Sequence, residues 1–304
     1  MHVVAVVGPT TAGKSSLAIE LALALGGEVV NADSMQLYRG MDIGTAKVTA
    51  QEMRGVPHHL LDVWPVTHPA AAAEYQELGR AALDDIAARG RVPILAGGSG
   101  LYIRAALEDL SFPITDAGTR SRLESLLAEQ GAASLHARLA ALDPAAAAAI
   151  LPSNGRRVVR ALEVIELTGQ PFSATMPTYD TSRPAVQLGI TLPRPELDSR
   201  IAARVDHMWA AGFEDEVRGL VTLGLRQGRT ASRALGYQQM LRHLDGSCTL
   251  DEARAETVKA TKRFARRQES WFRRDPRVHW LDPLAGDLLS QALARIRAAR
   301  SPSR

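Results

Sequence analysis

Short apolar runs alternate with amphipathic stretches along the first third of the chain. Such runs are too short for buried helices and end in polar or glycine-rich segments, which is typical of strands that are covered on both faces of a sheet. The strands expected here cover residues 3–7, 28–32, 57–63 and 91–96. Helical periodicity fills the stretches between them, most clearly over 16–25 and 70–89. This alternation predicts an α/β fold with a parallel sheet flanked by helices.

The pattern changes in the middle of the chain. From about residue 114 to 183 we find helical periodicity and no convincing strand. The helices expected there cover 120–129, 134–141, a segment opening at Asp143-Pro144, and 154–168. Residues 175–184, rich in proline, threonine and serine, are predicted to be a return linker. We therefore predict an all-helical insertion in the sheet domain, with a first part of the core at 1–113, the insertion at 114–185 and the rest of the core at 186–304.

The last third is predicted to rejoin the sheet and then to be mainly helical. Residues 186–192 form the returning strand in this prediction. The further elements expected are helices over 195–212, 213–223 and 249–274, a short strand over 278–281, and a C-terminal helix.

The first apolar run leads into a glycine-rich segment of defined spacing. Residues Gly8-Pro9-Thr10-Thr11-Ala12-Gly13-Lys14-Ser15 match the pattern G-x-x-x-x-G-K-S between a strand and a helix. Glycines let backbone N–H groups turn toward one point, and the following helix directs its positive end there. Lys14 adds a positive charge, and Ser15 offers a hydroxyl to Mg²⁺. The segment predicts a phosphate-binding loop and a P-loop NTPase-like core, but it identifies neither the molecule that carries the phosphate nor ATP.

Asp33 follows the second predicted strand at its carboxyl end. In open parallel sheets ligands bind beyond this edge, so Asp33 is expected near the phosphate loop. Its carboxylate has three possible roles: a general base, a metal ligand, or a cap for the following turn.

A second glycine turn, Gly97-Gly98-Ser99-Gly100, follows the strand at 91–96. Glycines at a strand end permit a ligand to approach the backbone closely, and Ser99 supplies a hydroxyl. Taken alone, this turn is weak evidence for a site.

A polar, turn-rich segment at 39–47 is predicted to form a surface loop over the site. Thr45 and Lys47 could reach a substrate from it, although a solvated lysine is the alternative. His58 and His59 are adjacent in a predicted strand and should point to opposite faces, so they are expected to have structural or hydrogen-bonding roles rather than to bind a metal together.

Positive charge is concentrated in the predicted helix 249–274. From Arg254 onward this segment carries eight lysines and arginines against Glu256 and Glu269, whereas the whole chain has a net charge of only +3. Trp271 and Phe272 lie among these basic residues. Basic and aromatic side chains together are typical of surfaces that bind unpaired nucleic acid. A helix with solvated charges and aromatics in the core gives the same pattern, so both interpretations stay open.

Composition narrows the class of protein. The chain has 304 residues, 46% of them hydrophobic, which suits one or two globular domains. It has one cysteine, Cys248, so neither an internal disulfide nor a multi-cysteine zinc site can form. Because no signal peptide and no membrane-spanning apolar stretch is evident, we expect a cytoplasmic protein without membrane contact. No surplus apolar surface is evident either, so we expect a monomer without a protein partner.

Several segments resemble the tRNA dimethylallyltransferase family of bacteria, in the same order. They are GPTTAGKS at 8–15, DSMQLYRGMDIGTAK at 33–47, PHHLLD at 57–62, GGSGLY at 97–102, NGRRVVRALEV at 154–164, ALGYQQM at 234–240 and RRQESWFRRD at 266–275. Together they span nearly the whole chain and are far more specific than the phosphate loop alone. A small departure is Ser99, where the family usually has threonine, and it keeps the hydroxyl.

The resemblance implies a reaction, its substrates and a set of residues. A dimethylallyl group would pass from dimethylallyl diphosphate to N6 of the adenine just 3′ of the anticodon, in tRNAs that read codons beginning with U. The phosphate loop would hold the diphosphate with Mg²⁺, for which Ser15 is the expected ligand, and Asp33 would accept the N6 proton. The other residues assigned to catalysis are Lys14, Thr10, Ser99 and Arg120. The residues expected to contact tRNA, chiefly its anticodon stem-loop, are Asp33, Ser34, Met35, Gln36, Ser99, Arg120, Arg156, Arg157, Arg160, Arg233, Arg266, Arg267, Gln268, Trp271 and Arg273.

Three other functions compete with this one. A small-molecule kinase or ATPase would share the phosphate loop, but it explains neither the basic helix nor the insertion. A prenyltransferase acting on free adenine nucleotides would not need the long basic region. A non-catalytic RNA-binding module would not need a complete phosphate loop together with Asp33.

Overall fold

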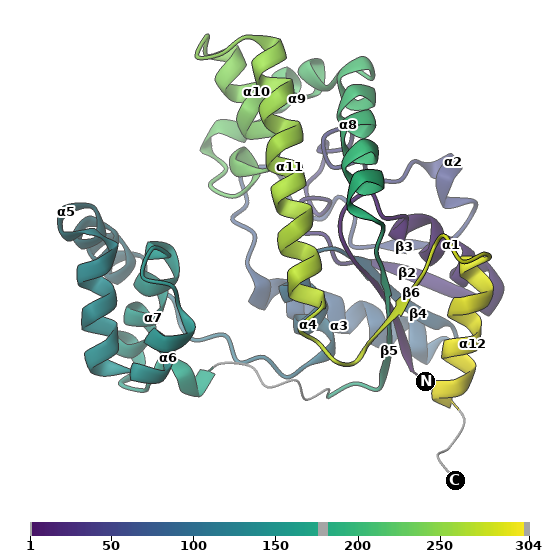
Figure 1. Cartoon of the computed structure of the whole chain (residues 1–304), viewed down its shortest axis with the longest axis horizontal. Coiled ribbons are helices and arrows are strands. Elements are labelled where there is room, and N and C mark those ends of the chain that lie inside the picture. Colours follow the sequence, from purple (N-terminus) through teal and green to yellow (C-terminus); the bar gives the residue numbers. More distant parts are fainter. Residues whose placement is uncertain (1, 176–181, 301–304) are drawn as a thin grey trace. The chain divides into compact units, whose positions relative to one another are not determined.

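A computed structural model describes residues 2–175 and 182–300 of the chain (Figure 1). Its centre is one sheet of six parallel strands in the order β3-β2-β4-β1-β5-β6. The strands are β1 (Val3–Val7), β2 (Gly27–Asn31), β3 (His58–His59), β4 (Val92–Gly97), β5 (Ala185–Ile190) and β6 (Val278–Leu281). The predicted α/β architecture with a parallel sheet is confirmed.

β1 lies between β4 and β5 and is fully buried along its length, as its unbroken apolar sequence predicts. Its neighbour β5 begins 182 residues later in the chain, with Val3 opposite Ala185. The strand predicted to return to the sheet after the insertion therefore does so between β1 and the edge strand β6.

The edge strand β3 is much shorter than the predicted strand over 57–63. Leu60 and Asp62 have φ values of +61° and +57°, in the left-handed region, which ends the extended backbone after His59. The two histidines have hydrogen-bonding roles, as expected: Nδ1 of His58 pairs with the carbonyl oxygen of Val56 at 2.9 Å, and Nε2 of His59 pairs with Glu28 at 2.7 Å.

Helices cover the sheet at positions close to those predicted. α1 (Lys14–Leu25) and α12 (Leu288–Arg300) share one apolar cluster with β1, β4 and β5. α3 (Ala72–Ala88) and α4 (Gly100–Leu107) pack together outside that cluster, and Tyr75 of α3 donates a buried hydrogen bond of 2.8 Å to the carbonyl of Asn31. The short α2 (Ala50–Met53) lies between β2 and β3 in the chain.

Residues 109–180 form a compact unit of their own, and residues 1–108 with 181–304 form the other. The predicted boundaries were 114 and 185. Most of the predicted return linker, residues 176–181, lies outside the described part of the chain. The helices of this unit are α5 (Ala117–Leu142), α6 (Pro144–Ala149) and α7 (Gly155–Thr168), followed by a 3-10 turn at Phe172–Thr175.

The two helices predicted at 120–129 and 134–141 are both present within the range of α5, and Gly131 separates them. Gly131 has a φ of +80° and a ψ of +163°, a conformation outside the helical region that glycine adopts readily. α6 begins as predicted, because the Asp143 carboxylate accepts a 3.0 Å hydrogen bond from the N–H of Ala146 and Pro144 occupies the first turn. Leu123, Leu139 and Leu162 lie in the core of the unit.

The remaining helices follow β5 in the chain. They are α8 (Arg194–Ala210), α9 (Phe213–Thr222), α10 (Tyr237–Leu244) and α11 (Leu250–Phe272), with 3-10 turns at Leu225–Gln227 and Ala231–Arg233. α11, the predicted basic helix, packs against α8 through an apolar cluster that includes Ile201 and Ala265. None of the helices in the described ranges is long and apolar enough to cross a bilayer.

Candidate active site

The phosphate loop connects β1 to α1 with a backbone that few residues could adopt. Gly8 has a φ of +142°, and a Cβ there would lie 2.2 Å from the carbonyl oxygen of Ile190. Gly13 has a φ of +98°, and a Cβ there would meet nothing within 4 Å. The first glycine therefore allows β5 to pass close behind the loop, whereas the second leaves open space before α1.

Thr11 is strained at the same loop. Its φ of +63° is unusual for a β-branched residue, and its buried hydroxyl has no hydrogen-bond partner among the described residues. Strained backbone and an unsatisfied buried polar group are typical of positions that a ligand completes.

Lys14 begins α1 and faces Asp33. Its ammonium group donates a 2.7 Å hydrogen bond to the carbonyl of Pro9. Burial lowers the pKa of Lys14 to about 8, against the opposing effect of the Asp33 carboxylate and with a smaller contribution from the positive charge of Arg204. An anion bound beside Lys14 would stabilise its charged form.

Asp33 lies just beyond β2 and lines the same cavity as Thr10, Lys14 and Ser15, as its position at a strand end predicts. Oδ1 of Asp33 accepts a 3.0 Å hydrogen bond from the N–H of Met35, so the predicted capping role is confirmed. Asn31 fixes the start of this segment, because its amide bonds both the backbone N–H and the carbonyl of Asp33. Within the described residues no donor bonds Oδ2, so the second oxygen is available for chemistry.

Arg204 of α8 is a site residue that sequence reasoning missed. It donates a 3.0 Å hydrogen bond to the hydroxyl of Thr10, and burial lowers its pKa despite the nearby Asp33 carboxylate. Together with Lys14 it places two cations at the phosphate loop. In the sequence, Arg204 is marked only by its position next to Val205 of the apolar stripe of α8. Many arginines occupy such positions, so this alone does not identify a site residue.

Three cavities meet at Arg204, which lines all of them. The loop cavity, about 240 Å³, lies between the phosphate loop and Asp33. The Asp33 cavity, about 330 Å³, extends along α8 and α11. Its walls combine polar and apolar side chains, including Ser34, Met35, Ser99, Met208, Arg233, Phe264 and Arg267.

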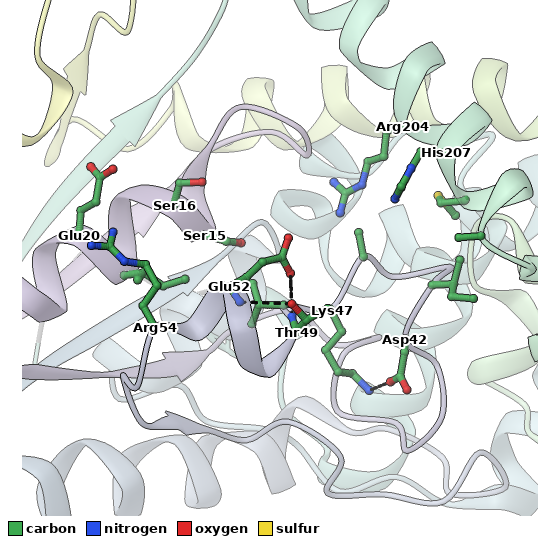
Figure 2. A pocket seen from close by; sticks show the side chains of 16 residues that line it. Ser15, Ser16, Glu20, Asp42, Lys47, Thr49, Glu52, Arg54, Arg204 and His207 are labelled. Carbon is green, nitrogen blue, oxygen red and sulfur yellow. Dashed lines mark hydrogen bonds and ion pairs between the residues drawn. The ribbon is translucent and has the colours of Figure 1, made fainter.

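The third cavity, about 650 Å³, opens beside Ser15 and is here called the Ser15 cavity. Arg204 and His207 extend from α8 into this space, and Glu52 lies among the side chains below them (Figure 2). The pKa of Glu52 is lowered mainly by hydrogen bonds from Thr49, with smaller contributions from the charges of Arg204 and His207.

The loop over the site is held by ion pairs and hydrogen bonds of charged side chains. Lys47 is only 6% exposed at its side chain and bonds Asp42, Asp62 and the carbonyl of Tyr38, so it is not a solvated lysine. Glu216 of α9 accepts hydrogen bonds from three successive N–H groups, those of residues 42–44, and from the hydroxyl of Tyr237. The loop is therefore fixed in place by these contacts and forms part of the wall of the site. Thr45 lines both the loop cavity and the Asp33 cavity.

The second glycine turn packs against side chains of α11, and its residues Gly97 and Gly98 also line the loop cavity. A Cβ on Gly98 would lie 2.2 Å from Nε2 of Gln268, and one on Gly100 would lie 2.1 Å from Nε1 of Trp271. The close approach at Gly98 and Gly100 is thus made by side chains of α11, and the approach of a ligand to this turn stays a prediction. Ser99, between them, does line the Asp33 cavity, and its hydroxyl lies 3.5 Å from the N–H of Ser34, which donates to it.

Gln268 was predicted to contact tRNA, but its side chain points inward and is 5% exposed. Its Oε1 accepts a 2.9 Å hydrogen bond from the N–H of Thr10, and its Nε2 donates one of 2.9 Å to the carbonyl of Gly98. Both polar atoms are thus engaged within the protein. Gln36 is similar, since its amide donates to the carbonyl of Thr45 at 3.1 Å while the residue lines the loop cavity.

The other side chains predicted on α11 face outward. Arg266, Arg267 and Arg273 are exposed, and Trp271 is 41% exposed while one edge packs on Gly100. Phe272 is 3% exposed and belongs to the core, as the second interpretation expects, whereas contact of Trp271 with nucleic acid stays a prediction. Arg273 is partly neutralised by Glu269 at 2.8 Å, whereas no carboxylate in the described ranges pairs with Arg266 or Arg267.

The arginines predicted in the insertion fall into two groups. Arg120 and Arg160 bond the fully buried Glu163 at 2.5 and 2.8 Å. Burial alone would raise the pKa of Glu163, but hydrogen bonds from both arginines outweigh it and hold the pKa below its ordinary value. These two arginines maintain the unit's own fold, while Arg156 and Arg157 are exposed on α7.

Comparison with known proteins identifies the family. The family model described as IPP transferase matches residues 36–275. The chain belongs to the IPP transferase family. The resemblance drawn from the sequence motifs is thereby confirmed, and the chain is a transferase.

Individual members of the family match over most of their length. The tRNA dimethylallyltransferase of Thermobifida fusca is 65% identical over 299 residues, covering 97% of this chain and 94% of that protein. The crystal structure of a full-length tRNA isopentenylpyrophosphate transferase from Bacillus halodurans is 41% identical with a TM-score of 0.71, covering 98% of this chain and 95% of that one. That of a eukaryotic dimethylallyltransferase acting on tRNA is 25% identical with a TM-score of 0.81, covering 100% and 81%.

Proposed function

We propose that the chain transfers the dimethylallyl group of dimethylallyl diphosphate to N6 of the adenine just 3′ of the anticodon, in tRNAs reading codons that begin with U. The N6–carbon bond forms, the bond from the allylic carbon to the diphosphate oxygen breaks, and the N6 proton leaves. The products are N6-dimethylallyladenosine and diphosphate. The observation that carries this proposal is the loop cavity, where Asp33 faces Lys14 and Arg204 across a phosphate loop.

The donor side of this cavity suits a leaving diphosphate. Lys14 and Arg204 are desolvated cations, and α1 begins at the loop with its positive end directed at it. Fixed charges in a site with little water stabilise charge that develops in the transition state. Thr10, held by Arg204, and the unsatisfied hydroxyl of Thr11 complete the set of donors.

Mg²⁺ is the metal proposed for this site, and the residues present fit it. Mg²⁺ at phosphate loops needs few protein ligands, because phosphate oxygens and water fill most of its coordination sphere. Ser15, which lines both the loop cavity and the Ser15 cavity, would hold it together with the donor's own oxygens. When bound, the ion would neutralise part of the diphosphate charge.

On the acceptor side, Asp33 is the proposed general base. Its Oδ1 caps the turn at Met35, which orients the carboxylate and leaves Oδ2 to accept the N6 proton. The adenine must leave its stack to reach this position, and the Asp33 cavity, with Met35, Met208 and Phe264 in its walls, offers apolar surface for a flipped base. Ser34 and Ser99 place polar groups along the same wall.

The tRNA is proposed to lie on the outward face of α11. Arg267 and Arg233 line the Asp33 cavity, and Arg266 and Arg273 extend the basic surface along the helix. Trp271 supplies a half-exposed ring on which an unpaired base could stack. In the insertion, Arg156 and Arg157 are the exposed candidates for phosphate contacts.

The Ser15 cavity gives the donor a route to the phosphate loop that does not pass through the Asp33 cavity. Its walls mix charged residues with apolar ones such as Ile19, Val48 and Met208, which suits a diphosphate with a short hydrocarbon tail.

We further propose that the protein works as a monomer in the cytoplasm. The single cysteine supports a reducing compartment, and the large exposed apolar side chains, for example Leu23 and Leu223, are on separate elements.

The experiment that tests this function uses purified protein, Mg²⁺, labelled dimethylallyl diphosphate and an unmodified anticodon stem-loop. After digestion of the RNA, label is expected on the one adenosine 3′ of the anticodon. Label on free AMP or ADP instead would support the prenyltransferase of mononucleotides. Consumption of ATP with no labelled product would support a kinase or ATPase, and RNA binding without either reaction would support a non-catalytic module.

A further inference from the structure

Gln268 connects the helix that faces the RNA to both halves of the active site. It lies on α11, 258 residues after Thr10 and 170 after Gly98, and it bonds the backbone of both with one amide group. The side chain is almost fully buried, and it reaches the second turn only because Gly98 has no Cβ. Both polar atoms of the side chain are hydrogen-bonded, and a glycine is needed to make room for it. An apolar side chain that only filled the space would need neither hydrogen bond.

Each of the two hydrogen bonds of Gln268 is made to a segment that carries a residue of the proposed reaction. At the phosphate loop, the N–H of Thr10 is held by Gln268 while its hydroxyl is held by Arg204. At the second turn, Gly98 precedes Ser99, whose hydroxyl accepts from the N–H of Ser34, the residue after the proposed base. One side chain thus sets the spacing between the donor loop and the acceptor segment.

The two arginines that precede Gln268 on α11 are exposed, whereas Trp271 packs on the same glycine turn as Gln268. Arg266 and Arg267 are exposed immediately before it, and Trp271 is half-exposed one turn later with its indole edge on Gly100. A helix is stiff over this length, so a shift that RNA imposes on the outer face is carried to the inner face. Hydrogen bonds weaken steeply with angle and distance, which makes the Gln268 pair sensitive to such a shift.

We infer that Gln268 is a positioning residue through which bound RNA orders the donor site. This inference rests on the proposed function. Gln268 lines the loop cavity, but both of its polar atoms are bonded to the protein backbone. Its role is to hold the phosphate loop in its diphosphate-binding form when α11 is fixed by RNA. Because coupling between two sites is reciprocal, RNA should tighten diphosphate binding and diphosphate should tighten RNA binding by the same factor.

The test measures the affinity for inorganic diphosphate with Mg²⁺ by calorimetry, with and without a saturating anticodon stem-loop. Couplings between sites are commonly about 5–150-fold, so RNA is expected to lower the dissociation constant of the wild-type protein by at least about fivefold. In Gln268→Met, which keeps the length but neither hydrogen bond, the factor is expected to fall to about one. Gln239→Met is the matched control: Gln239 is also 5% exposed and accepts a hydrogen bond, from the N–H of Gly236, on α10.

Three results would overturn the inference: an unchanged factor in Gln268→Met, an equal loss in Gln239→Met, or no effect of RNA in the wild-type protein. The effect of RNA on diphosphate affinity in the wild-type protein is measured without any variant. The inference can therefore be overturned even if Gln268→Met does not fold. Labelled transfer to the stem-loop by the wild-type protein is measured in parallel. If transfer occurs and the coupling is absent, only the role of Gln268 fails; if no RNA is bound or labelled, the proposed function fails.

Discussion

The two glycine turns at the ends of β1 and β4 resemble each other in sequence and differ in what they contact. In the first, Gly8 lies against the carbonyl of Ile190, but a Cβ on Gly13 would meet nothing within 4 Å, and Thr11 has an unsatisfied hydroxyl. In the second, Gln268 fills the space at Gly98 and Trp271 fills the space at Gly100. The comparison teaches that a glycine at a strand end shows that something approaches the backbone closely. Whether that is a ligand or the protein's own helix depends on contacts far apart in sequence.

The largest expected effect comes from removing the carboxylate opposite the open turn. Asp33→Ala is expected to lower the rate of transfer by about 10²–10⁴-fold, because a positioned base contributes about that much. The affinity for the stem-loop should change little, since the basic face of α11 is untouched. Single-turnover transfer and RNA binding are measured side by side.

Asp33→Asn separates the two roles of this residue. An asparagine oxygen can still accept the hydrogen bond from Met35, but it cannot take the N6 proton. Transfer should therefore be lost in both variants. A normal rate in Asp33→Asn would leave Asp33 as a turn cap and require another base.

A pair of glycine substitutions compares the turns directly. In Gly100→Ala the new Cβ overlaps the Trp271 indole, so Trp271 should be displaced, with a loss of about 1–3 kcal/mol in stability and weaker RNA binding. In Gly13→Ala the Cβ has space but φ is +98°, which costs about 1–2 kcal/mol and should weaken diphosphate binding instead. Thermal unfolding, tryptophan fluorescence and the two affinities are measured for each variant. If both variants lose the same ligand, the two turns do not have separate functions.

Removing charge from the outer face of α11 sharpens the contrast between its two faces. Arg266→Ala combined with Arg267→Ala should weaken RNA binding and reduce the slope of log affinity against log salt by about one unit for each lost phosphate contact. Arg254→Ala is the matched control on the same helix, because Asp206 already neutralises Arg254 at 2.5 Å. A slope unchanged from the wild type in the double variant would assign these arginines to the fold.

The smallest expected effect is a dependence of donor binding on pH. The pKa of Lys14 is about 8 in the free protein, so its charge is present below that pH and is lost above it. The affinity for Mg²⁺ and diphosphate should therefore fall above pH 8, by at most about tenfold per pH unit for one proton. Lys14→Arg stays charged and reports the titration of the ligand itself, so the difference between the two profiles isolates Lys14. Identical profiles would mean that Lys14 stays protonated throughout.

Local patterns were enough to predict the sheet, the phosphate loop and the position of Asp33. In each case a short segment determines the geometry: an apolar run, a glycine spacing, or the end of a parallel strand. The residues that sequence reasoning missed or misplaced depend on tertiary contacts. Arg204 sits in mid-helix without a motif, and Gln268 looks like one more polar residue in a basic run until α11 is packed against Gly98. The end of β3 was also missed, because left-handed φ values at Leu60 and Asp62 leave no clear mark in the sequence.

The insertion leaves and re-enters the core at a single point. The carbonyl of Leu107 accepts hydrogen bonds of 3.2 Å from the backbone N–H of Arg183 and from the hydroxyl of Ser182. The two ends of the long inserted segment are therefore held together by these hydrogen bonds. The pairing of β5 with β1 does not depend on what the segment between them contains. During synthesis on the ribosome, β1 to β4 emerge long before β5, and a folded excursion would shorten the distance that the nascent chain must close. The same geometry makes Leu107 and Ser182 suitable junctions for replacing the insertion with another folded module.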